Sequence, residues 1–238
     1  MAALAGLLVF FSTTAYGQVL LDDFSTDSRS KYDFVPVFAN PSDGWTVTAG
    51  ELRPSIGSSG AATWFWNQGE KLSATGDSVS ISLSLPAGAD PTTPSIIGLF
   101  LAADAASIAL GYEITTYTTI GGAWYYSVGG SAQQAGSPPS GPVLLTIQRT
   151  DQQTVDGFRY NTTFSGGGLL SPITDFFIDP ADSLQFGPFA YNTTGTAAGL
   201  DDFTFTAVPE PSMYAAVFGF LALATAVIRN RTSRRFSA

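Results

Sequence analysis

Strict alternation of apolar residues and serines over Asp77–Leu85 is the feature that most constrains the fold of this chain. Apolar side chains occupy every odd position from Val79 to Leu85, and serine occupies every even position from Ser78 to Ser84. A repeat of two places successive side chains on opposite faces of an extended strand. The segment therefore predicts a half-buried strand, with one face in a core and the other in water.

Short apolar segments separated by turn signals continue this pattern along the chain. The expected strands are 19–24, 32–38, 44–48, 51–56, 61–66, 77–85, 95–103, 108–116, 123–128, 143–149, 155–164, 184–191 and 200–208. The composition of 133–142 predicts a loop, the stretch 169–180 is ambiguous, and Pro54 indicates that 51–56 is an edge strand. The 3.6-residue repeat of an amphipathic helix is almost absent. These features predict an all-β domain, a two-sheet antiparallel β-sandwich or jelly roll.

The composition excludes several classes of chemistry. The chain contains no Cys and no His, so disulfides, thiolate nucleophiles, Cys/His zinc sites and histidine acid–base catalysis are all ruled out. Residues 18–208 carry 18 acidic and 6 basic side chains, a net charge of −12. A domain with that charge repels nucleic acid phosphates, so we expect no nucleic acid partner.

Two copies of the tetrapeptide Leu-Asp-Asp-Phe stand near the two ends of the expected domain, at 21–24 and 200–203. The termini of a domain often lie close together, so we expect these strands to pair or to flank the same edge. Convergence would gather Asp22, Asp23, Asp201 and Asp202, and hard carboxylate oxygens suit Ca²⁺. The alternative is that each Asp caps a strand end or faces water, and no known calcium-loop spacing supports the metal site.

Aromatic residues form the second candidate site. Trp64, Trp66 and Trp124 are candidate glycan-binding residues, because exposed aromatic rings on a sandwich stack against sugar rings. Core packing is the stronger alternative, since alternate side chains of a strand point inward and large aromatics dominate cores.

Catalytic residues are scarce. Glycoside hydrolysis needs two carboxyl groups a few ångströms apart, in different environments. The expected domain has three Glu residues, Glu51, Glu70 and Glu113, and they are scattered. The Glu-x-Asp-x-x-Glu arrangement of sandwich-fold glucanases is absent. We therefore expect no enzymatic activity, with a glycan-active enzyme as the least favoured alternative.

The N-terminal segment has the properties of a secretory signal peptide. The apolar stretch Ala2–Phe11 is followed by small residues at Ala15 and Gly17, which form a cleavage pattern before Gln18. The usual basic residues at the start are missing. We expect residues 1–17 to direct export.

The C-terminal segment predicts a transmembrane helix. Met213–Ile228 is an apolar run of sixteen residues, which spans roughly 24 Å as a helix and is a little short of a bilayer core. A cluster of basic residues follows it as a stop-transfer signal that stays in the cytoplasm. These residues are Arg229, Arg231, Arg234 and Arg235.

Together with the triplet Pro209-Glu210-Pro211, this segment resembles the PEP-CTERM sorting signal of exported bacterial proteins. The resemblance covers about 208–235, and it implies recognition of the triplet by an exosortase after transient anchoring in the inner membrane. It further implies a Gram-negative host that makes exopolysaccharide or biofilm matrix. The body of the chain loosely resembles concanavalin/laminin-G-type sandwiches, at the level of fold alone.

The sequence thus predicts a signal peptide at 1–17, a β-sandwich at 18–207 and a sorting signal at 208–238 with its helix at 213–228. We expect an exported protein of the cell surface or extracellular matrix, with a structural or adhesive role among extracellular polysaccharides. The alternative is a carbohydrate-binding module, with or without Ca²⁺.

Overall fold

The computed structural model describes most of the β-rich part of the chain. The described residues are 17–38, 44–57, 60–84, 96–102, 112–118, 124–128, 131–136, 141–154, 157–166, 173–178, 184–191, 193, 198–208 and 218–225. The chain divides into two units, one of which is Gln18–Thr206 and the other Met1–Gly17 with Ala207–Ala238. The larger unit contains the sheets.

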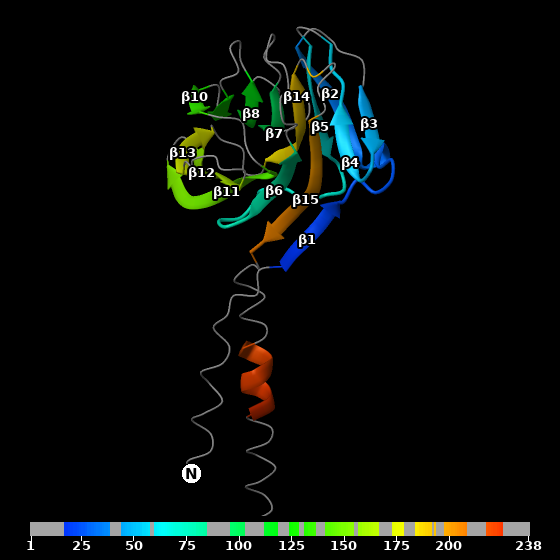
Figure 1. Cartoon of the computed structure of the whole chain (residues 1–238). Coiled ribbons are helices and arrows are strands. Elements are labelled where there is room, and N and C mark those ends of the chain that lie inside the picture. The colour runs from blue at the N-terminus through cyan, green and yellow to red at the C-terminus, as the bar shows by residue number, and fades with distance from the viewer. Residues whose placement is uncertain are drawn as a thin grey trace, which may run out of the picture. The chain divides into compact units, whose positions relative to one another are not determined.

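Two antiparallel sheets form a sandwich (Figure 1). The eight-stranded sheet has the order β13 (Ile173–Ile178), β12 (Gly157–Gly166), β11 (Val143–Thr154), β6 (Ser78–Ser84), β15 (Gly199–Ala207), β4 (Glu51–Pro54) and β3 (Trp45–Thr48), with β1 (Gly17–Asp22) also paired to β15. The seven-stranded sheet has the order β10 (Ser131–Gly136), β9 (Trp124–Val128), β8 (Tyr112–Thr118), β7 (Ile96–Ala102), β14 (Gln185–Tyr191), β5 (Ala61–Trp66) and β2 (Tyr32–Phe38). A short 3₁₀ helix, η1 (Arg29–Lys31), precedes β2. The predicted all-β sandwich is confirmed.

The alternation of apolar residues and serines that predicted β6 matches the alternation of buried and partly exposed side chains along the strand. Val79, Ile81 and Leu83 are fully buried, whereas the serines between them are partly exposed. β6 lies between β11 and β15, so its serine face forms the middle of the outer surface of the eight-stranded sheet.

Aromatic side chains from both sheets fill the space between them. The ring of Trp45 on β3 meets that of Trp64 on β5 at a centroid distance of 5.5 Å. Tyr32 lies 4.8 Å from Trp45 and 5.3 Å from Trp66. Edge-to-face contacts of this kind add to the large apolar area that each ring buries. The two sheets are therefore joined by an aromatic core.

This core corrects the assignment of Trp64 and Trp66 as glycan-binding residues. Trp64 is 1% exposed and Trp66 is 5% exposed, because both rings pack against aromatic side chains of the other strands. Neither ring leaves a face free for a sugar. Trp124 belongs to β9, and its side chain lies outside the described part of the structure.

Three expectations about strands differ from the structure. The expected loop at 133–142 contains most of β10, which forms a hairpin with β9 although its polar sequence has no alternation. The unassigned stretch at 169–180 contains β13, paired with β12. β4 is not an edge strand, since it lies between β15 and β3, and Pro54 is accommodated as its last residue.

The expected signal peptide lies almost wholly outside the described residues, as do Pro209, Glu210, Pro211 and the four arginines of the tail. Within the expected C-terminal helix, residues 218–225 are helical. In the part of the chain that the structure describes, no helix combines the length and the apolar character needed to cross a membrane.

Candidate functional site

The outer face of the eight-stranded sheet carries hydroxyl and amide groups. On β11 the buried residues Val143, Leu145 and Ile147 alternate with outward residues that include Thr146 and Gln148. The same alternation along β6, β12 and β15 places further polar side chains on this face. They are Ser78, Ser80, Ser82, Asn161, Thr163, Thr204 and Thr206.

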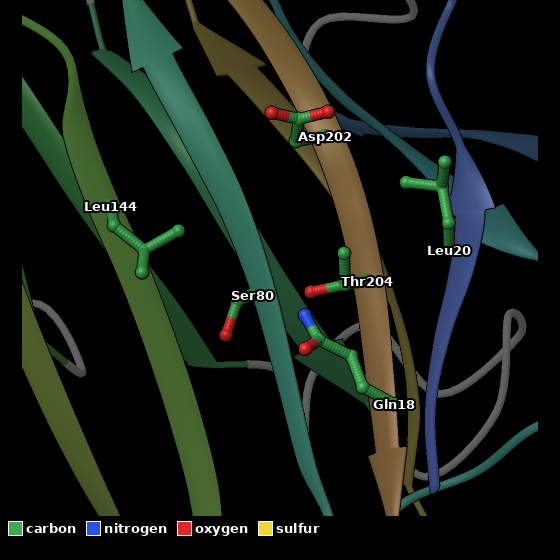
Figure 2. Close-up of a pocket in the computed structure, with 6 residues that line it drawn as sticks. All are labelled: Gln18, Leu20, Ser80, Leu144, Asp202 and Thr204. Carbon is green, nitrogen blue, oxygen red and sulfur yellow. The ribbon is translucent and has the colours of Figure 1, made fainter.

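An open depression of about 470 Å³ lies on this face. It is lined by residues from four strands, which are Gln18, Leu20, Ser80, Leu144, Asp202 and Thr204. Figure 2 shows the side chain of Gln18 crossing over β15, with its amide toward Ser80 and Thr204. Strands β1, β6, β11 and β15 are far apart in the sequence, so only the sheet order brings these side chains together.

A β-bulge places Asp202 at the depression. The pairing of β15 with β6 shifts register between Asp201 and Thr204. Asp202 adopts a positive φ of 47°, and its backbone N–H donates to Oδ1 of Asp201 at 2.7 Å. A bulge re-aims a side chain that regular pleating would direct elsewhere. The carboxylate of Asp202 is exposed and lines the depression.

The carboxylates beside this bulge make the local potential negative. Burial is the main cause that raises the pKa of Asp201, and the charges of Asp202, Glu51 and Asp23 raise it further, while the hydrogen bond from the Asp202 backbone opposes them. The negative charges of these carboxylates also repel an approaching anion. This end of the depression therefore favours an uncharged or cationic group.

Two leucines give the depression its apolar part. Leu20 is 53% exposed and Leu144 is 41% exposed, on strands whose other outward positions are mostly polar. Exposed leucines beside an amide, hydroxyls and a carboxylate can contact a molecule that has both hydroxyl groups and apolar C–H surface. A polyhydroxylated ligand has that combination.

The predicted meeting of the first and last strands is confirmed, because β1 pairs with β15. Asp22, however, is not available to the other three aspartates. Asp22 is buried, and its carboxylate accepts hydrogen bonds from the hydroxyls of Ser28 and Tyr32 and from the backbone N–H of Phe24. Asp23 is exposed and accepts from the Ser25 N–H at 3.0 Å.

Across the described residues, no group of three or more acidic side chains is arranged to hold a metal ion. The oxygens of Asp22 are already used by protein donors, which leaves them poorly placed for a cation shared with Asp201 and Asp202. Calcium binding at these four residues stays a prediction.

A second buried polar cluster lies between the sheets, and sequence reasoning missed it. Nη1 of Arg149 donates to the backbone carbonyls of Leu72 and Ser73, at 3.1 and 2.7 Å. The carboxylate of Asp77 accepts from the backbone N–H groups of Ser73 and Ala74. Burial raises the pKa of the neighbouring Tyr160 to about 12. The cluster fixes the loop before β6. The sequence could have revealed it, because Arg149 lies two residues after Ile147 and therefore on the same inward face of β11.

The residues of the depression were also missed, apart from Asp202, which the sequence predicted as a metal ligand. The sequence feature that could have pointed to them is Leu144, an apolar side chain at an outward position of β11. Exposed leucines are common enough that this signal alone does not identify a site.

No family model matches the chain, and no curated protein matches its sequence. Solved structures do match its fold. The metal-free form of lectin I-B4 from Griffonia simplicifolia aligns with a TM-score of 0.51 and 10% identity, over 80% of this chain and 98% of the lectin. A lectin from Bauhinia forficata in complex with GalNAc aligns with a TM-score of 0.48 and 7% identity, over 81% of this chain and 97% of that one.

A mutant GH43 protein, BlXynB from Bacillus licheniformis, aligns with a TM-score of 0.50 and 15% identity, over 79% of this chain and 39% of that protein. At these identities the likeness concerns the fold alone. The chain therefore has an all-β sandwich that resembles lectin folds.

Proposed function

We propose that the sandwich is a carbohydrate-binding domain and that the depression on the outer face of the eight-stranded sheet is its glycan site. The observation that carries this proposal is the lining of the depression, where two exposed leucines lie beside an amide, two hydroxyls and a carboxylate. The resemblance of the sandwich to a lectin supports it at the level of fold.

Each part of that lining has a role in holding a sugar. The carboxylate of Asp202 accepts hydrogen bonds from sugar hydroxyls, and bonds to a charged acceptor are stronger than neutral ones. Gln18, Ser80 and Thr204 both donate and accept. Leu20 and Leu144 contact the C–H surface of the ring, so that an apolar area leaves water while the hydroxyls stay paired.

Binding without turnover is the favoured activity, because two of the three candidate acids are already hydrogen-bonded. The Glu51 carboxylate accepts from Nη2 of Arg53 and from the Ser84 hydroxyl, both at 2.7 Å. The Glu70 carboxylate accepts from Nε1 of Trp66 at 2.6 Å. A glycosidase needs one carboxyl group free to give a proton and a second opposite it.

The binding test uses affinity electrophoresis in gels that contain xylan, hydroxyethylcellulose, dextran, chitosan or alginate. We expect retardation by at least one neutral polysaccharide, and we expect Leu144→Lys to weaken it about tenfold through a lost apolar contact and added bulk. Thr48→Lys is the matched control, because Thr48 is exposed on β3 and does not line the depression. Unretarded migration in all five gels, or retardation of Leu144→Lys equal to that of the unchanged protein, would refute the proposal.

We also propose that this domain acts outside the cell, as an adhesive component of an extracellular polysaccharide matrix. The support is the apolar start of the chain and the Pro-Glu-Pro, apolar and arginine-rich order of its end. Intact-mass spectrometry of the protein recovered from its host is the test. A polypeptide that starts at Gln18 and ends near Pro211 is the expected result, whereas one that retains Met1 and Ala238 contradicts both export and sorting.

A further inference from the structure

Four hydroxyl groups extend from the depression across the outer face of the eight-stranded sheet. Thr204 on β15 pairs with Ser80 on β6, Ser80 pairs with Thr146 on β11, and Thr146 pairs with Thr163 on β12. All four residues are partly exposed. We call this cross-strand row of Thr204, Ser80, Thr146 and Thr163 the hydroxyl track.

The members of the track lie next to one another in space, as their register requires. Directly opposite residues on neighbouring strands have Cβ atoms about 5 Å apart. The hydroxyls of Ser80 and Thr146 are 2.9 Å apart and share a hydrogen bond. Two of the four, Ser80 and Thr204, also line the depression, so the depression is one end of the track and Thr163 is the other.

The length of the track exceeds one sugar ring. Three inter-strand steps of about 4.8 Å place Thr163 about 14 Å from Thr204. A ligand that used every hydroxyl of the row would be an extended chain lying across the strands. A single sugar held in the depression would reach Ser80 and Thr204 and leave Thr146 and Thr163 in water.

The rows on either side of the track are uncharged between β6 and β12. One flanking row contains Ser82, Leu144 and Ser165, and the other contains Ser78, Gln148 and Asn161. Most protein surfaces carry Lys, Glu, Arg and Asp at such outward positions. Asp202 and its neighbouring carboxylates stand at one end of the track and repel anions. This surface offers hydrogen bonds to sugar hydroxyls, and the track and its two flanking rows hold no cation for a uronic acid between β6 and β12. The nearest basic residue at an outward position of β12 is Arg159, one row beyond Asn161.

We infer that the track is an extended glycan site, and that its ligand is a neutral, β-linked polysaccharide bound along internal segments of the chain. β-1,4-linked hexoses form straight ribbons with hydroxyls along their edges, which is the form that a row of cross-strand hydroxyls can bind. This inference rests on the proposed function, and it names the class of glycan and its direction across β15, β6, β11 and β12.

Calorimetric titration of the full-length chain with cellobiose, cellotetraose and cellohexaose is the test. We expect affinity to rise about tenfold or more from cellobiose to cellohexaose, because the longer chain gains hydrogen bonds at Thr146 and Thr163. Thr163→Lys should lower the affinity for cellohexaose about tenfold and leave that for cellobiose unchanged. Thr163→Val, which keeps the shape and removes the hydroxyl, should have the same selectivity with a smaller loss, and far-ultraviolet circular dichroism checks that both variants fold.

Equal affinity for the three oligosaccharides would overturn the extended site, and so would a Thr163→Lys variant that binds cellohexaose like the unchanged chain. The same holds if cellohexaose fails to bind while another polysaccharide of the gel panel binds, or if alginate binds more tightly than hydroxyethylcellulose. If no polysaccharide of the gel panel binds, that separate outcome refutes the proposed function itself.

Discussion

Two adjacent aspartates have opposite environments in this protein. Asp22 is 4% exposed, and its carboxylate is surrounded by the Ser28 and Tyr32 hydroxyls, the Phe24 N–H and Nζ of Lys31 at 3.7 Å. Asp23 is exposed, and its carboxylate accepts from the nearby Ser25 N–H. Burial and hydrogen bonding to Asp22 also raise the pKa of Tyr32, which keeps that phenol protonated as a donor. The identity of a residue does not decide its role; its neighbours do.

We predict that Asp22→Ala lowers the free energy of unfolding by about 2–4 kcal/mol, because it leaves buried donors without their acceptor. Asp23→Ala is the matched control, with a clearly smaller expected loss, because Asp23 is exposed. Urea unfolding followed by tryptophan fluorescence measures both. Equal losses for the two variants would show that Asp22 does not organise the residues around it.

The raised pKa of Asp201 predicts a dependence of stability on pH. The folded state holds this proton more tightly than the unfolded chain, so the contribution of Asp201 is most favourable below 3.8, the unfolded value, and becomes less favourable as the pH rises through the raised pKa. Asp201→Asn keeps the acceptor for the Asp202 N–H and removes the charge. We expect it to stabilise the fold at neutral pH by less than about 1 kcal/mol, since the residue is only partly buried and solvent screens its charge.

The measurement compares thermal unfolding of Asp201→Asn and the unchanged protein at neutral pH and near pH 3, where the difference should disappear. Asp23 has a lowered pKa, so Asp23→Asn should not stabilise the fold at neutral pH. A gain for Asp201→Asn that is the same at both pH values would contradict the electrostatic cause.

At the scale of elements, the turn between β3 and β4 shows how local sequence specifies a hairpin. Thr48 pairs with Glu51, and the two residues between them, Ala49 and Gly50, have φ values of 56° and 80°. Positive φ at both positions is what a type I′ hairpin turn requires. Gly50 adopts it freely, whereas Ala49 has a Cβ that disfavours it.

We predict that Ala49→Asn stabilises the protein by about 0.5–1 kcal/mol, because Asn tolerates the left-handed region better than Ala. Ala49→Val should destabilise it, since a β-branched side chain is disfavoured there. The midpoint of urea unfolding separates the two variants. The hairpin interpretation would be wrong if Val and Asn shifted the midpoint in the same direction.

The two Leu-Asp-Asp-Phe segments have the same local sequence but different backbone conformations. In the first copy the residue with positive φ is Phe24, and in the second it is Asp202. Phe24 is fully buried and stacks against Tyr32, with centroids 6.5 Å apart. The second copy lies within the ladder between β15 and β6, where the bulge moves the turn one residue earlier. Pairing partners therefore decide the conformation of each copy.

At the scale of the whole molecule, the aromatic core belongs entirely to the unit Gln18–Thr206. We predict that a fragment spanning residues 18–208 unfolds at the same temperature as the full-length chain. A fragment that begins at Ser25 should lose several kcal/mol or fail to fold, because it lacks the buried side chains of Leu21, Asp22 and Phe24. Differential scanning calorimetry makes the comparison, and a midpoint for the 18–208 fragment well below that of the full chain would contradict it.

The sequence by itself determined the class of fold, the position of most strands and the inward face of alternating strands such as β6 and β11. Those properties depend on the alternation of residues along a single strand. In β6, for example, the two-residue repeat in the sequence is also the repeat of buried and partly exposed side chains. It also predicted that the first and last strands meet. The polar sequence of β10 carried no such signal, so that strand could not be found locally.

Only the tertiary structure decided which side chains form a site. Trp64 and Trp66 are buried because side chains from β2, β3 and β15 pack against them. The depression is assembled from β1, β6, β11 and β15, and hydrogen bonds between strands that are distant in sequence set the register of the hydroxyl track. Contacts between neighbouring strands depend on sheet order and register, which a local pattern does not encode. Alternation therefore predicts an outward serine at position 80, and the sheet alone places Thr204, Thr146 and Leu144 around it.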